Sequence, residues 1–90
     1  MKNKIIVYTS NNCGYCVSAK KLLKEKNLSY EELNIQLDTS AYAEMLEKSN
    51  GMRTVPQIFI NNNHVGGYDD LATIAANGDL NKLLINEQES

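Results

Sequence analysis

The amino-acid sequence predicts an α/β fold: a four-stranded mixed sheet, with three parallel strands and one antiparallel strand, and helices on both faces. Short apolar runs rich in β-branched residues alternate with segments of helical periodicity, in the order β-α-β-α-β-β-α. Strands joined through a helix are expected to run parallel, with right-handed crossovers. Only an asparagine turn separates the last two strands, which predicts an antiparallel hairpin.

The N-terminal half is predicted to contribute two strands and two helices. Residues 4–8 form an apolar run typical of a buried strand. A helix is expected from residue 13 or 14 to residue 26, with its lysines on a solvated face. Residues 30–35 indicate a second strand, although their alternation is only partly regular. The second helix is expected to begin at the capping oxygens of residues 38–40 and to end at Gly51, where a left-handed residue is favoured.

The C-terminal half is predicted to contribute the hairpin and two helices. Residues 57–60 indicate a buried strand, and residues 64–65 a short partner. Two helical patterns follow, the last of them over residues 80–85. We expect residues 1–90 to form a single domain, with a frayed tail over residues 86–90.

Composition and charge exclude several classes of function. The chain has 90 residues, a net charge of −2 and no block of basic residues, so nothing indicates a nucleic-acid partner. Its longest apolar run is far shorter than the roughly 20 residues that a membrane-spanning helix needs. The basic N-terminus precedes an apolar segment too short for a secretion signal. We therefore expect a cytoplasmic protein without a membrane partner, and we expect it to be monomeric.

The only two cysteines, Cys13 and Cys16, lie where the first strand turns into the first helix. Residues three apart share a helix face, so the sulfurs can meet as a disulfide or separate as two thiols. A loop this small stabilises the fold little, which favours reversible redox chemistry. Cys13 is the candidate nucleophile, because the unpaired N–H groups of Tyr15 and Cys16 at the helix start favour a thiolate and lower its pKa. Cys16 would then attack the mixed disulfide on Cys13.

Two other interpretations of the cysteines stay open on the residues alone. One is a zinc site, although zinc usually takes four ligands and His64 is the only further soft or imidazole donor. The other is an inert pair. His64 itself is predicted to be a surface histidine without a role. Pro56, the only proline, predicts either a break at a strand edge or a cis bond after Val55.

Three motifs together resemble the dithiol glutaredoxins, which have the thioredoxin fold. They are Cys13-Gly14-Tyr15-Cys16, Thr54-Val55-Pro56-Gln57-Ile58-Phe59-Ile60 and Gly66-Gly67-Tyr68-Asp69-Asp70-Leu71. The resemblance covers nearly the whole chain. Thioredoxins carry Trp before the first cysteine, whereas this chain has Asn12 there and no Trp.

The resemblance implies a groove for glutathione beside Cys13. Val55, before a cis-Pro56, would offer its backbone to the cysteinyl part of the tripeptide, like an added strand. The γ-glutamyl end would bind at the start of the third helix, where N–H groups suit a carboxylate. Arg53 would pair with the glycyl carboxylate. The residues that the resemblance assigns to the groove are Tyr15, Arg53, Thr54, Val55, Pro56, Gly67, Tyr68 and Asp69.

Plainer interpretations of some groove residues stay open. Asp69 and Asp70 also fit simple complementation of the helix dipole. Tyr15 could be a packing residue, and Arg53 a solvated surface residue.

The activity that the resemblance implies is a glutathione-dependent thiol–disulfide oxidoreductase acting on protein–glutathione mixed disulfides and protein disulfides. One alternative is a [2Fe–2S] cluster-binding dimer, in which Cys13 of two chains and two glutathiones hold the cluster. Another is a thioredoxin-like electron donor served by a flavoprotein reductase. Two departures from the family pattern matter: Ser10 stands where many members have a basic residue, and Gly14 replaces the usual proline. Ser10 predicts weaker glutathione binding or a less acidic Cys13, and Gly14 a looser helix start.

Overall fold

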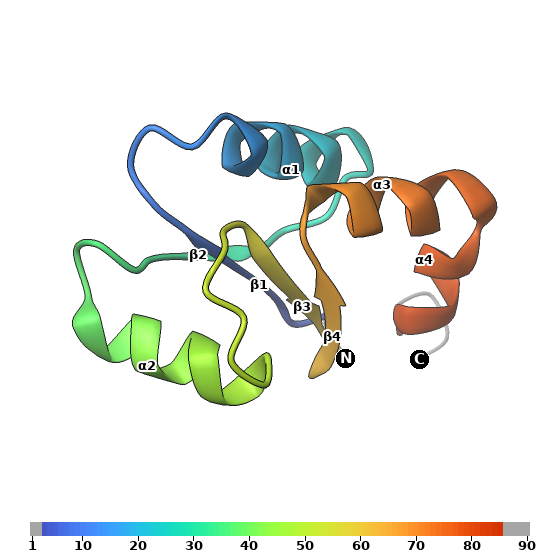
Figure 1. Cartoon of the computed structure of the whole chain (residues 1–90). Coiled ribbons are helices and arrows are strands. Elements are labelled where there is room, and N and C mark those ends of the chain that lie inside the picture. The colour runs from blue at the N-terminus through green and yellow to red at the C-terminus, as the bar shows by residue number, and fades with distance from the viewer. Residues whose placement is uncertain (1–2, 86–90) are drawn as a thin grey trace.

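The computed structural model describes residues 3–85. In chain order, the elements are β1 (Ile5–Thr9), α1 (Gly14–Glu25), β2 (Glu31–Asn34), α2 (Thr39–Lys48), β3 (Gln57–Ile60), β4 (Asn63–Gly66), α3 (Tyr68–Asn77) and α4 (Asp79–Leu83). The strands lie in the order β2-β1-β3-β4 (Figure 1). Every strand and helix predicted within these residues is present, with bounds that differ by at most three residues. The predicted frayed tail over residues 86–90 lies outside the described part.

The prediction of three parallel strands is wrong. β1 pairs with β2 in parallel, but β1 with β3 and β3 with β4 pair antiparallel, so the sheet holds one parallel pair. The prediction assumed that α2 alone carries the chain back across the sheet. Residues 49–56, which follow α2, instead return the chain to the edge where β1 ends, and Gln57 at the start of β3 pairs with Tyr8. This return places the proline motif beside the cysteine pair.

Helices cover both faces of the sheet, as predicted (Figure 1). Successive side chains of a strand point to opposite faces, so β1 contributes to both cores and all five of its residues are buried. The core under α1, α3 and α4 consists of Ile5, Val7, Ala19, Leu23, Ile58, Ile60, Leu71 and Leu80. The core under α2 consists of Ile6, Tyr8, Ala41, Met45 and Phe59. The central strands are therefore held rigidly from both sides.

Local signals in the sequence explain several element ends. Asp38 is the N-cap of α2, and its carboxylate accepts hydrogen bonds from the N–H groups of Ser40 and Ala41. Asn61 and Asn62 have left-handed φ angles of 49° and 70° in the β3–β4 turn, as the asparagine run predicts. No helix within residues 3–85 is long and apolar enough to cross a membrane.

Candidate active site at the cysteine pair

The cysteine pair lies at the junction of β1 and α1, as predicted. Cys13 is the N-cap of α1 and has extended backbone angles, with φ −108° and ψ 105°. Its Sγ accepts a hydrogen bond from the N–H of Cys16 at 3.1 Å and forms a disulfide with the Cys16 sulfur. Cys13 is half-buried, whereas Cys16 is only 2% exposed. The two sulfurs therefore differ in access: Cys13 faces the surface and Cys16 lies behind it.

The proline motif lies against Cys13. The carbonyl oxygen of Val55 is 3.8 Å from the Cys13 Sγ, and the Val55–Pro56 peptide bond is cis, which confirms the second interpretation of Pro56. Val55 lies outside the β3 ladder, which begins at Gln57, so its backbone is not committed to that pairing. Thr54 is exposed and Pro56 is buried. Backbone that lies outside the ladder and beside the Cys13 sulfur is an arrangement that an extended peptide could join.

A polar pair beneath Thr54 was missed by the sequence analysis. Gln57 is 2% exposed, and its Nε2 donates to the Thr54 Oγ1 at 3.2 Å. Its Oε1 lies 2.7 Å from the His64 Nε2, and the His64 ring stacks on Phe59 at 4.8 Å. His64, to which no role was assigned, thus contributes to holding Thr54. A glutamine within an otherwise apolar buried strand is the signal that could have identified this pair, because buried polar groups need partners.

The start of α3 closes the other side of the predicted groove. Gly67 is the N-cap of α3, and its N–H donates to the Asp70 Oδ2 at 3.1 Å. A side chain at Gly67 would lie 3.6 Å from the Pro56 carbonyl oxygen, so this segment adjoins the proline motif. Tyr68 stacks on Tyr15 from the first turn of α1, with ring centroids 6.1 Å apart.

The structure thus brings the three sequence motifs together around Cys13. Tyr15 is 65% exposed, which does not fit the plainer interpretation of this residue as core packing. Asp69 is exposed at the first turn of α3. Arg53 is exposed in the loop before Thr54, and within residues 3–85 no ion pair holds it.

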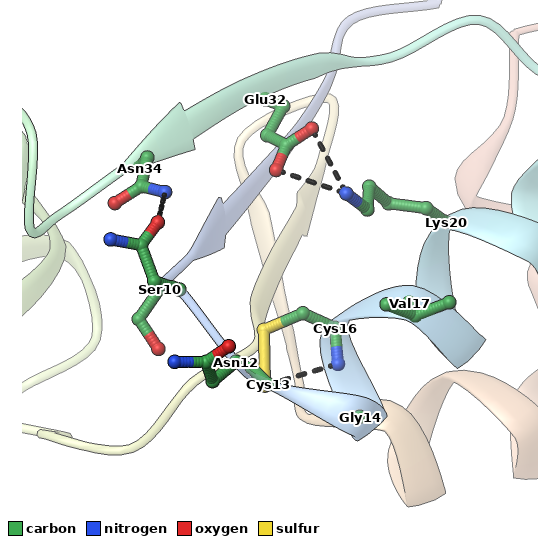
Figure 2. Close-up of a pocket in the computed structure, with 10 residues that line it drawn as sticks. Ser10, Asn12, Cys13, Gly14, Cys16, Val17, Lys20, Glu32 and Asn34 are labelled. Carbon is green, nitrogen blue, oxygen red and sulfur yellow. Dashed lines mark hydrogen bonds and ion pairs between the residues drawn. A yellow bond between two sulfur atoms is a disulfide. The ribbon is translucent and has the colours of Figure 1, made fainter.

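A polar pocket of about 520 Å³ lies on the β2 side of the cysteine pair (Figure 2). Its lining residues are Ser10, Asn11, Asn12, Cys13, Gly14, Cys16, Val17, Lys20, Glu32 and Asn34. The Lys20 Nζ forms an ion pair with the Glu32 Oε2 at 3.1 Å, and the Thr9 Oγ1 donates to the same oxygen at 2.8 Å. The hydrogen bond from Thr9, followed by the contacts with Lys20, holds the pKa of Glu32 below its ordinary value. The sequence analysis placed Lys20 on a solvated face, but this lysine reaches across to β2.

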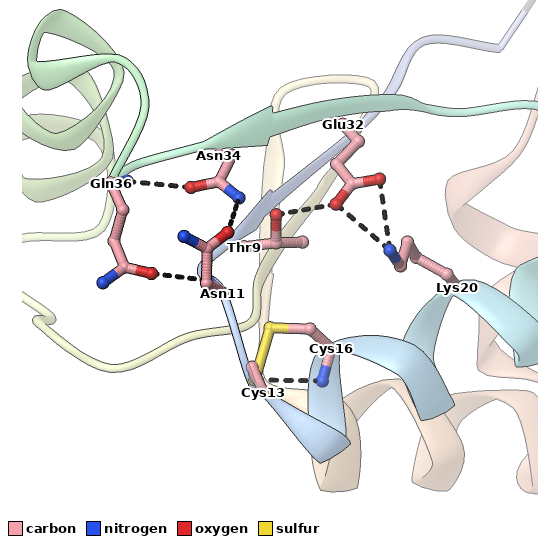
Figure 3. Close-up of polar contacts among 8 residues, drawn as sticks. All are labelled: Thr9, Asn11, Cys13, Cys16, Lys20, Glu32, Asn34 and Gln36. Atoms are coloured by element: carbon pink, nitrogen blue, oxygen red, sulfur yellow. Dashed lines mark hydrogen bonds and ion pairs between the residues drawn. A yellow bond between two sulfur atoms is a disulfide. The ribbon is translucent and has the colours of Figure 1, made fainter.

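Amide side chains fix the loop that leads into Cys13 (Figure 3). The Asn34 Nδ2 donates to the Asn11 Oδ1 at 3.0 Å, and the backbone N–H of Asn11 donates to the Gln36 Oε1. The backbone N–H of Gln36 in turn donates to the Asn34 Oδ1 at 2.9 Å. These bonds tie the β1–α1 loop to the end of β2, which holds the N-cap position steady.

The described part of the chain offers no ready-made metal centre. Over residues 3–85, no three or more His, Cys, Asp or Glu side chains gather closely enough to hold a metal ion. A zinc site at the cysteine pair therefore lacks its further protein ligands.

The sequence is similar to those of known proteins with a redox-active cysteine site, the glutaredoxins. A family model described as Glutaredoxin matches residues 5–65. Glutaredoxin 1 of Rickettsia conorii is 49% identical over 87 residues, which cover 96% of this chain and 85% of that protein. Glutaredoxin 3 of Escherichia coli is 46% identical over 78 residues, which cover 87% of this chain and 93% of that protein.

Solved structures give the same result. The crystal structure of a buckwheat glutaredoxin–glutathione complex superposes with a TM-score of 0.79 at 29% identity, covering 91% of this chain and 76% of that one. The solution structure of a glutaredoxin from Brucella melitensis superposes with a TM-score of 0.75 at 42% identity, covering 90% of this chain and 87% of that one.

Proposed function

Because the chain belongs to the glutaredoxin family of disulfide oxidoreductases, we propose that it is a glutathione-dependent thiol–disulfide oxidoreductase. Its substrates are protein–glutathione mixed disulfides and protein disulfides. Cys13 attacks and Cys16 resolves. The observation that carries the proposal is the position of the Cys13 sulfur, which accepts an N–H at the start of α1 and lies 3.8 Å from the Val55 carbonyl oxygen.

In the first step, the Cys13 thiolate attacks the glutathione sulfur of a mixed disulfide. The bond between substrate and glutathione breaks, a Cys13–glutathione disulfide forms, and the substrate leaves as a thiol after taking a proton. The N–H of Cys16 and the positive end of α1 favour the thiolate over the thiol, which makes Cys13 the better nucleophile near neutral pH.

In the second step, the Cys13–glutathione disulfide is broken in one of two ways. A free glutathione thiolate attacks the bound glutathione, which yields glutathione disulfide and regenerates Cys13. Alternatively, Cys16 attacks Cys13, which yields the disulfide seen in the structure and releases glutathione. With a protein disulfide as substrate, Cys13 forms a disulfide with the protein instead, and Cys16 breaks it by attacking Cys13, which releases the reduced protein. Two glutathione thiols then reduce the Cys13–Cys16 disulfide and leave as glutathione disulfide.

The groove between the proline motif and α3 is the proposed glutathione site. The free edge at Val55 takes the cysteinyl part, and the first turn of α3 takes the γ-glutamyl carboxylate, with Asp69 facing the ammonium. Tyr15 and Tyr68 form a wall beside it, since their rings stack. The known complex of a buckwheat relative with glutathione supports a binding site for the tripeptide in this fold.

A Cys16→Ser variant tests this assignment directly. Treated with glutathione disulfide and weighed by mass spectrometry, it should carry one glutathione on Cys13, and free glutathione should remove it. A Cys13→Ser variant, which replaces the sulfur acceptor at the N-cap position with an oxygen, is the matched control and should carry none. An adduct on Cys16 instead, or none on either variant, would contradict the proposed roles. Turnover with glutathione as the sole reductant also separates this activity from that of a thioredoxin-like donor served by a flavoprotein reductase.

The residues of one chain do not fit a [2Fe–2S] cluster. Over residues 3–85 no group of three or more metal-ligating side chains exists, so a cluster would require Cys13 from two chains together with glutathione. Anaerobic reconstitution with iron, sulfide and glutathione, followed by iron analysis and sizing of the protein, measures whether such a dimer forms.

A further inference from the structure

The pocket on the β2 side gives Cys16 its own charged neighbour. Cys16 and Lys20 are one helical turn apart on α1, so they share a face. Helical side chains lean toward the N-terminus of their helix, which directs Lys20 back over Cys16. Figure 2 shows the Lys20 side chain extended across the pocket, on the side of α1 where Cys16 lies.

Glu32 holds the Lys20 ammonium in this place. Both carboxylate oxygens lie within hydrogen-bond distance of the Lys20 Nζ, at 3.2 Å and 3.1 Å. Thr9, which is 1% exposed, anchors the same carboxylate from β1 (Figure 3). The side chains of Lys20 and Glu32 are 27% and 37% exposed, so the pair is partly shielded from water. A lysine on an open helix face would sample many rotamers, whereas this one is held by Glu32, whose carboxylate is itself bonded to Thr9.

We propose that Lys20 is the electrostatic partner of the Cys16 thiolate, and that Glu32 is the residue that positions it. Resolution requires this anion: Cys16 gives its proton to water in the pocket, and the thiolate attacks the Cys13 sulfur. The bond between Cys13 and glutathione breaks, the Cys13–Cys16 disulfide forms, and glutathione leaves as a thiolate that takes a proton. In this step the Cys16 sulfur is oxidised and the departing glutathione sulfur is reduced, while the Cys13 sulfur is in a disulfide before and after. The inference rests on the proposed resolving role of Cys16.

Cys16 needs such a partner more than Cys13 does. It is 2% exposed, and burial disfavours a thiolate. Its backbone N–H already serves the Cys13 sulfur. The charged residues that line the pocket are Lys20 from α1 and Glu32 from β2. On the other side of the cysteine pair, the first turn of α3 carries the exposed Asp69 and Asp70. The Asp70 carboxylate accepts a hydrogen bond from the N–H of Gly67.

The test is a single-turnover measurement of resolution. Reduced protein is mixed with a stoichiometric amount of glutathione disulfide, quenched in acid, and weighed to separate the glutathione adduct from the internal disulfide. We expect Lys20→Met to slow decay of the adduct about threefold to tenfold on the acid side of the rate profile and to move the midpoint of that profile to higher pH. Lys20→Arg should restore the wild-type profile. Lys21→Met, which alters the next, exposed lysine of α1, should leave it unchanged.

A charge-swapped double variant, Lys20→Glu with Glu32→Lys, distinguishes electrostatics from packing. It keeps an ion pair between α1 and β2 but places an anion beside Cys16, so it should resolve the adduct more slowly than Lys20→Met. Recovery of the wild-type midpoint by the swap, or an unchanged midpoint in Lys20→Met, would overturn the inference. If the wild-type protein itself formed an adduct that never converted to the internal disulfide, the resolving role of Cys16 would fail instead.

Discussion

Replacing Gly66 with alanine is expected to distort the proposed glutathione groove at the start of α3. Gly66 ends β4 with a φ of 117°, in a region that L side chains rarely adopt. A Cβ built there overlaps the carboxylate of Asp70. That carboxylate accepts the N–H of Gly67, the first residue of the segment proposed to bind the γ-glutamyl end. The substitution therefore combines backbone strain with displacement of the cap.

The size of the effect follows from these two contributions. Left-handed backbone strain at a residue with a Cβ costs about 1–2 kcal/mol. Displacing a capping carboxylate costs a further 0.5–2 kcal/mol, roughly, by comparison with N-cap deletions. Gly51→Ala is the matched control, since Gly51 has a φ of 91° but open space around its Cβ position. We expect Gly66→Ala to lower the free energy of unfolding by about 0.5–2 kcal/mol more than the control does.

Urea denaturation of both variants measures this difference, and the KM for a glutathionylated peptide reports on the groove. The KM should rise in Gly66→Ala and stay near the wild-type value in Gly51→Ala. Adding Asp70→Ala removes the overlap, so in that background Gly66→Ala should cost no more than Gly51→Ala does. Equal losses of stability in the two single variants would refute the claim that Asp70 is displaced.

Two further predictions concern the charge near Cys13 and the core under α2. Ser10→Lys should lower the pH midpoint of Cys13 alkylation and the KM for a glutathionylated peptide, because it adds a cation at the rim of the pocket. Iodoacetamide kinetics measure the midpoint and steady-state assays measure the KM. If neither value changed, the prediction would be wrong. Burial, followed by the hydrogen bond to Glu44, raises the pKa of Tyr8 above its ordinary value. The neutral Tyr8 hydroxyl therefore stabilises the folded state relative to the unfolded state. This contribution to the free energy of unfolding is fully present below about pH 10 and is lost as the pH rises above it, by up to roughly 1.4 kcal/mol per pH unit. In urea titrations at a series of alkaline pH values, Tyr8→Phe should lose less of its free energy of unfolding per pH unit than the wild-type protein does. The same pH dependence in both proteins would contradict this prediction.

The elements of the fold could be predicted from local patterns, but the direction of β3 could not. Apolar runs and capping residues such as Asp38 act within a few residues, so their effect is visible in the sequence. The direction of β3 depends on the path of residues 49–56, which contain no periodic pattern. The prediction used the rule that strands joined through a helix run parallel. The connection between β2 and β3 contains α2 and also residues 49–56, which bring the chain back across the sheet.

The site divides in the same way. Cys13, the proline motif and the start of α3 could be found because each is a contiguous motif. The pairing of Lys20 with Glu32 joins residues of different elements. Helical spacing places Lys20 on the same face as Cys16, but it does not show that Glu32 on β2 lies within reach. The contact of Gln57 with His64 is likewise made across a hairpin. Contacts between residues that are distant in the sequence can be identified only once the positions of the strands in the sheet are known.

The sulfur that is proposed to react also closes the first turn of α1. Chemistry and helix initiation at this position are therefore performed by a single atom, and a substitution that deletes one affects the other unless it supplies a new acceptor. Serine does so and alanine does not. An inactive form made with alanine would consequently start its helix differently from the active protein, and binding data obtained with it would report on a reshaped surface.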